Sequence, residues 1–165
     1  MGLGQTIRGL SGGVLPAALG HRTHRTGLAA DLGTAPSDVN LFRITGGPIL
    51  LTSVYGKVTT VINGAGVLIQ LQHTPTGLAQ EVLCAISLTI HPDAVDTIYT
   101  ITGAVAVALA PSDQVGVSDA SMATNFLMLL PGIMNMEVTV ATATGVIDWT
   151  IHWVPLDFDS RVAPL

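Results

Sequence analysis

The feature of this sequence that most constrains the fold is a two-residue alternation of apolar and polar side chains, which recurs from Val39 onward. Successive side chains of an extended strand point to opposite faces, so this alternation is typical of strands with one buried face. It is clearest near the C-terminus, where one face would carry Ile147, Trp149, Ile151 and Trp153 and the other Asp148, Thr150 and His152. Similar runs lie at residues 67–72, 99–102 and 134–140.

Turn-forming residues separate these runs at intervals of roughly 8 to 12 residues. Glycine, proline, asparagine or aspartate gather at residues 46–48, 63–64, 75–77, 91–93, 111–113, 131–132 and 144–145. We expect about nine or ten strands. Even spacing without amphipathic helices predicts an all-β fold, either an antiparallel β-sandwich or a jelly-roll-like barrel. Residues 120–130 are ambiguous, because Met122, Phe126 and Leu129 or Leu130 would also share one side of a short helix.

Residues 1–40 differ from the rest and are predicted to form an extended N-terminal arm, with residues 41–165 as the β-sandwich body. The first 40 residues hold eight of the 18 glycines and two of the prolines. Three arginines against two aspartates give this segment a net charge of +1, whereas three basic against nine acidic residues give the body −6. We therefore expect a slightly basic arm that lies against another surface.

Composition indicates what covers the surface of this chain. Only 10% of its residues are charged, compared with about 25% in typical soluble domains, and mean hydropathy is +0.58. The best candidate for a spanning helix, residues 120–136, contains asparagine, proline and glycine, and 4% aromatic residues are too few for the girdles of an outer-membrane barrel. We expect neighbouring protein chains and no membrane. A net charge of −5 without a clustered basic surface predicts no nucleic-acid partner.

Signals for catalysis or metal binding are weak. His21 and His24 would approach one metal ion only on a helix, and the two arginines beside them would repel it. Residues 157–159 offer two carboxylates for calcium but lack the longer loop pattern that calcium sites need. The sequence contains no His-Glu-x-x-His motif, and its Gly-x-Ser-x-Gly match at residues 9–13 follows no predicted strand, as a nucleophile elbow would. We expect a protein that is not an enzyme and has no cofactor and no metal.

Three stretches resemble virion structural proteins of tailed bacteriophages. They are Arg43–Thr52 followed by Gly56–Ile62, then residues 97–103, and the closing Trp149–Leu156. The resemblance implies a decoration, or cement, protein on the exterior of the head. Such a protein is assembled in the host cytoplasm, sits across joints between copies of the major capsid protein, and is commonly a trimer.

The predicted function is therefore that of a capsid-decorating structural subunit whose body self-associates. Arg8, Arg22 and Arg25 of the arm are the candidate partner-binding residues, because they could pair with acidic groups on the capsid. Two alternatives stay open. One is another virion component, such as a tail or head fibre, and the other is a carbohydrate-binding β-module, for which exposed aromatic side chains would be expected.

Overall fold

The computed structural model describes residues 20–33, 36–90, 92–112, 125–139 and 143–165, and within them strands are the main regular structure, with no α-helix. The longer strands are β2 (Ser37–Thr45), β3 (Ile49–Asn63), β4 (Leu68–Pro75), β9 (Gly132–Thr139) and β10 (Thr144–Pro155). The shorter ones are β1 (His21–Arg25), β5 (Glu81–Val82), β6 (Ile98–Thr100), β7 (Ala110–Pro111), β8 (Leu127–Leu129) and β11 (Arg161–Pro164). A 3-10 turn, η1, covers Ala29–Asp31.

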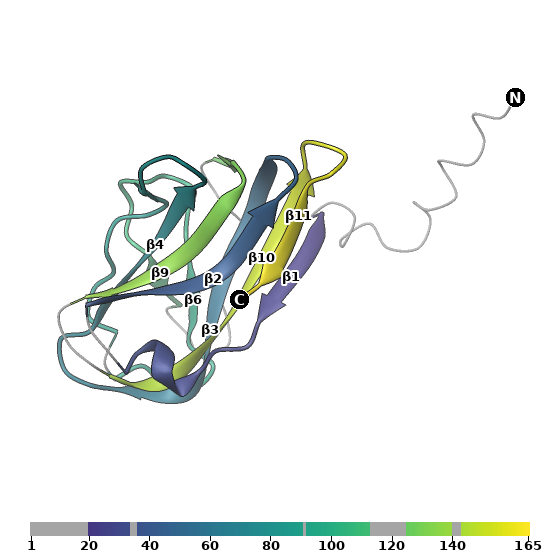
Figure 1. Ribbon diagram of the computed structural model, residues 1–165. Coiled ribbons are helices and arrows are strands. Elements are labelled where there is room, and N and C mark those ends of the chain that lie inside the picture. The colour runs from purple at the N-terminus through teal and green to yellow at the C-terminus, as the bar shows by residue number, and fades with distance from the viewer. Residues whose placement is uncertain (1–19, 34–35, 91, 113–124, 140–142) are drawn as a thin grey trace, which may run out of the picture.

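The strands form two sheets that face each other, which confirms the all-β class and makes the fold an antiparallel sandwich (Figure 1). One sheet has the order β1-β10-β3-β6-β7, with β8 also paired to β3, and the other has the order β11-β2-β9-β4-β5. Each connection from β2 to β3, β3 to β4, β9 to β10 and β10 to β11 changes sheet. A parallel bridge between Ala85 and Ala108 joins segments next to β5 and β7, so the two sheets are tied along that side.

The core lies between the sheets and uses the apolar faces that the alternation predicted. The first face, on β10, is buried from Ile147 to Trp153, with Trp149 fully inaccessible. The inward residues of the other runs are buried as well: Val67, Ile69, Leu71, Tyr99, Ile101, Met134, Met136 and Val138. Val140, the last member of its run, lies outside the described residues. Alternation predicted these faces because every second side chain of a strand meets the opposite sheet.

The predicted boundary between arm and body was wrong. β1 pairs with β10 from His21↔Trp153 to Arg25↔Trp149, and β2 begins at Ser37, so residues 21–40 contribute two strands to the sandwich. β1 carries no apolar alternation because it is an edge strand whose outward side chains meet solvent. Residues 1–19 lie outside the described part, and the arm prediction now concerns these residues alone.

The ambiguous segment before Pro131 forms a strand in its described part. β8 pairs with the start of β3, from Leu127↔Leu51 to Leu129↔Ile49. Residues 120–124, including Met122, lie outside the described residues. The strand alternative therefore holds for residues 127–129, where pairing with a long central strand decides a conformation that periodicity left open.

Close packing between β3 and β10 depends on a glycine. Gly56 is the partner of Trp149 across the two strands, and a Cβ at Gly56 would lie 2.8 Å from the indole ring. The ring therefore fills the space that any other residue at position 56 would need. Gly33 offers a contrast, because a Cβ there would meet nothing closer than 3.5 Å.

We predict that Gly56→Ala lowers the free energy of unfolding by about 1–3 kcal/mol, because the added methyl group overpacks the core against Trp149. Denaturant unfolding followed by tryptophan fluorescence measures this change. Gly33→Ala is the matched control and is expected to change stability by less than about 0.5 kcal/mol. Equal effects of the two substitutions would contradict the packing argument.

Candidate protein interaction surfaces

An apolar groove opens between the two sheets where β4 and β8 approach the same end of the sandwich. Its volume is about 390 Å³, and its lining comes from β4, β5, β8 and the loops beside them: His73, Pro75, Leu78, Glu81, Val82, Leu83, Val105 and residues 127–130. Leu83 and Leu129 are buried in the groove, whereas Leu78 and Met128 are 61% and 63% exposed at its rim. Large apolar side chains exposed together in this way are typical of surfaces that bind another protein.

One polar ring lies in this groove. His73 is buried, and its Nδ1 lies 3.2 Å from the carbonyl oxygen of Ile133. Burial lowers the pKa of His73 below its ordinary value, and this effect outweighs the carbonyls of Ile133 and Leu130, which favour the protonated ring. The groove therefore presents an uncharged imidazole among leucines at neutral pH.

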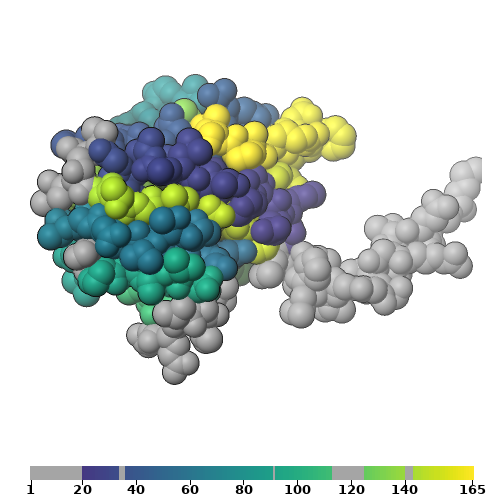
Figure 2. Space-filling model, turned by 90° about the horizontal axis from the view of Figure 1, so that it is seen from below, coloured from purple at the N-terminus to yellow at the C-terminus, as the bar shows by residue number. Residues whose placement is uncertain are grey.

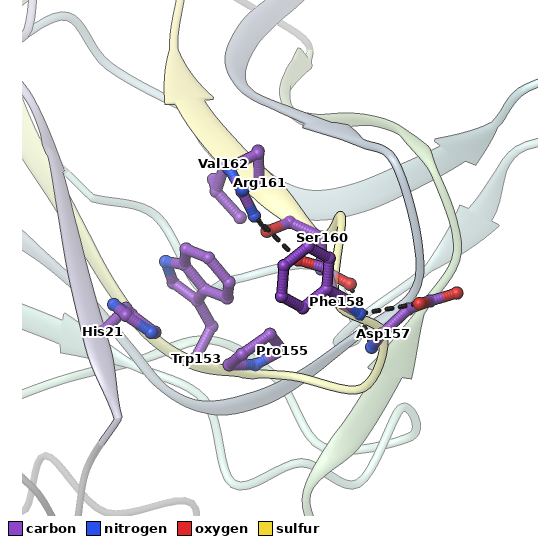
Figure 3. Close-up of a pocket in the computed structure, with 8 residues that line it drawn as sticks. All are labelled: His21, Trp153, Pro155, Asp157, Phe158, Ser160, Arg161 and Val162. Atoms are coloured by element: carbon purple, nitrogen blue, oxygen red, sulfur yellow. Dashed lines mark hydrogen bonds between the residues drawn. The ribbon is translucent and has the colours of Figure 1, made fainter.

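A second hollow lies beside the loop that joins β10 to β11. Figure 3 shows Trp153 and Pro155 on one side of it and Phe158 on the other. Phe158 is 90% exposed, and the ring of His21 stacks on Trp153 with 4.8 Å between centroids. The hollow thus combines exposed aromatic and apolar surface next to the point where the described chain begins.

The loop at this hollow is held by its own hydrogen bonds. Ser160 donates its hydroxyl to the carbonyl of Pro48 at 2.7 Å, and the carboxylate of Asp157 accepts the backbone N–H of Phe158 at 2.6 Å. The carboxylate is therefore engaged in a local turn. Within the described residues no group of three or more His, Cys, Asp or Glu side chains is placed to share a metal ion.

The two histidines that sequence spacing suggested as metal ligands lie on opposite faces of β1, because residues three apart in a strand point in opposite directions. His21 stacks on Trp153, whereas Nδ1 of His24 lies 3.0 Å from the Thr150 hydroxyl and its Nε2 lies 3.8 Å from Asp148. The helical arrangement that would bring the imidazoles together is absent from this segment, which is a strand.

The three predicted partner-binding arginines have different environments. Arg8 lies outside the described residues. Arg22 is exposed on β1, where it is the partner of His152 on β10. The pKa of His152 is lowered mainly by burial, and the positive charge of Arg22 lowers it further. Arg22 remains a candidate for contact with a partner.

Arg25, by contrast, is 5% exposed and acts inside the fold. Its guanidinium binds both carboxylate oxygens of Asp31, at 2.7 and 3.2 Å, and its Nε donates to the carbonyl of Leu165 at 2.8 Å. Figure 2 shows the first described segment, in purple, packed beside the yellow C-terminal segment. A surface role for Arg25 does not fit this arrangement, because its donors are committed to the chain's own acceptors. Sequence spacing did not reveal the pair, since η1 creates it.

We predict that Arg25→Ala destabilises the protein by about 3–5 kcal/mol, because it leaves the buried Asp31 carboxylate without its counter-charge. Arg22→Ala is the control from the same strand and is expected to change stability by less than about 0.5 kcal/mol. Chemical denaturation of both variants tests this. A small effect of Arg25→Ala would mean that the buried pair is not needed for folding.

His73 predicts how stability changes with pH. Because its pKa is lowered in the folded state, the unfolded chain binds more protons once the pH falls below about 6.5. The free energy of unfolding should therefore decrease from pH 7.5 to 5.5. His73→Gln should reduce this decrease, leaving the part due to His152, whose pKa is also lowered. Unfolding measured at both pH values tests the prediction, and an unchanged decrease in the variant would contradict it.

Some apolar positions at these surfaces were not identified from sequence, because an exposed leucine looks the same as a buried one in a hydropathy pattern.

Within the described residues, no helix is long and apolar enough to cross a membrane. Comparison with protein-family models, with curated protein sequences and with solved structures finds no match. The function is therefore argued from the surfaces themselves.

Proposed function

We propose that this chain is a structural subunit of a tailed-phage particle that decorates the capsid exterior. It acts through self-association and through contacts with the major capsid protein. The observation that carries the proposal is the group of large apolar side chains that are exposed at the apolar groove: Leu78, Val82, Val105, Met128 and Leu130. Removing apolar surface from water contributes about 25 cal/mol per Å², and this gain must exceed the entropy that two chains lose when they associate.

The distribution of charge supports association with protein. Lys57 is the only lysine of the chain, and its ammonium group binds Asp96 at 2.7 Å, which raises the pKa of Lys57. Among the described residues that line the apolar groove, His73 is the only basic side chain and Glu81 is the only acid. A surface with so few charges loses little hydration when another chain covers it.

The resemblance of residues 43–62 and Trp149–Leu156 to virion proteins supports the particle assignment, and it is what distinguishes a capsid partner from any other protein partner. The carbohydrate-binding alternative has less support. Trp149 and Trp153 are in the core, so neither indole offers a flat face to a sugar ring. Tail and head-fibre positions differ from decoration only in where the subunit binds, and microscopy separates them.

The test is binding to empty heads assembled from the major capsid protein of the same phage. The purified protein should copellet with heads and saturate at a fixed number per capsomer, and electron microscopy should place it on the outer surface. A control with heads that already carry the protein should show no further binding. Location on the tail would replace decoration with the other virion role, and failure to bind any particle would contradict the proposal.

A further inference from the structure

The apolar groove exposes Leu78 and Met128 at its rim, and the chain contains a segment of matching chemistry. Residues 1–19 include no acidic residue, one arginine at position 8, five glycines and a set of apolar side chains: Leu3, Ile7, Leu10, Val14, Leu15 and Leu19. The described lining of the groove consists mainly of leucines, valines and a methionine, and Glu81 is the only carboxylate among these described residues. Apolar side chains with one positive charge therefore complement an apolar groove with one negative charge.

The position at which the described chain begins makes this segment available near the groove. His21 pairs with Trp153, Trp153 with Leu51, and Leu51 with Leu127 of β8, so the start of β1 and the groove lie at the same end of the sandwich. They are separated by three strand spacings, about 14 Å. Nineteen residues can span about 60 Å when extended, which is long enough to reach a groove on an adjacent molecule.

The same topology favours a neighbouring copy over the chain's own groove. β1 is the edge strand at one side of its sheet, whereas β8 lies on the far side of β3 and β5 is the edge of the second sheet on that side. The β2–β3 turn and the β10–β11 loop project from the same end of the sandwich as the start of β1 (Figure 1). Between molecules, the exit edge of one copy can face the groove edge of the next directly.

We infer that residues 1–19 of one copy occupy the apolar groove of the next copy, so that each subunit gives a segment to one neighbour and receives one from the other. This inference rests on the self-association in the proposed function and names the contact responsible. A contact between two different surfaces is head-to-tail, and such a contact forms a closed ring when its rotation allows, as in a trimer. The groove then becomes a buried part of the interface.

The first test changes the groove in the full-length protein. Leu78→Glu places a charged group on the apolar rim of the groove, and this group would have to lose its hydration when apolar side chains bind there. Its matched control is Leu88→Glu, the same substitution at a leucine that is 79% exposed and does not line the groove. Light scattering across a dilution series measures the protein concentration at which the oligomer dissociates. For Leu78→Glu this concentration should be at least about ten times that of the unaltered protein, whereas Leu88→Glu should match the unaltered protein.

The second test identifies the occupant by disulfide trapping. One chain carries Ser11→Cys in the terminal segment, and a co-expressed chain of different mass carries Ala79→Cys next to Leu78. The native Cys84 is buried, so the unaltered protein serves as the control without cross-links. Mild oxidation should join the two chains, and addition of Leu78→Glu to the Ala79→Cys chain should abolish the product.

Each result decides between the inference and the proposed function. Cross-linking only when both cysteines are in one chain would overturn exchange between copies. A stable oligomer without the cross-chain product, unaffected by Leu78→Glu, would overturn the inference while leaving decoration intact. A protein that is monomeric and also fails to bind heads would overturn the proposed function as well.

Discussion

The pairing of β3 with β10 is the interaction on which the rest of the structure depends. These are the two longest strands, and they remain paired from Ile49↔Pro155 to Asn63↔Thr144. β1, β6 and β8 are attached to them, so the whole first sheet is built on this pair. The indole of Trp149 occupies the space above Gly56 and is fully buried between the sheets. Backbone hydrogen bonds set the distance between the two strands, and the glycine leaves room for the largest buried side chain of the core.

The Arg25–Asp31 pair performs a different task, since it joins the beginning and the end of the described chain. Arg25 belongs to an edge strand with little apolar surface of its own, and its guanidinium links η1 to the carbonyl of Leu165. Desolvation offsets much of the attraction within a buried bidentate pair of this kind. The pair therefore fixes the relative position of the segments that it joins more than it adds to net stability. It holds β1 in place, and β1 in turn decides where residues 1–19 leave the sandwich.

The inferred association between copies depends on two places in the sandwich: the start of β1, where residues 1–19 join it, and the apolar groove. The uncharged surface of the chain is concentrated beside β5 and β8, and the segment that would cover it leaves from the opposite edge. Surfaces placed on opposite edges favour assembly into rings over isolated pairs. Such an assembly is compatible with the proposed decorating role. Phe158 and the hollow near Trp153 form a second apolar surface at the same end of the sandwich.

Sequence alone determined the strand class and the inward faces, because a two-residue period leaves only one face to bury and turn residues mark where each strand stops. That reasoning placed Trp149 and Trp153 in the core correctly. It misplaced β1, since an edge strand needs no apolar alternation, and it assigned Arg25 to a surface, since charge gives no sign of burial. Tertiary structure alone decided these points and the groove. Which leucines are exposed depends on how two sheets meet at their ends, and residues distant in the chain, such as Leu78 and Met128, come together only when the strands between them have paired.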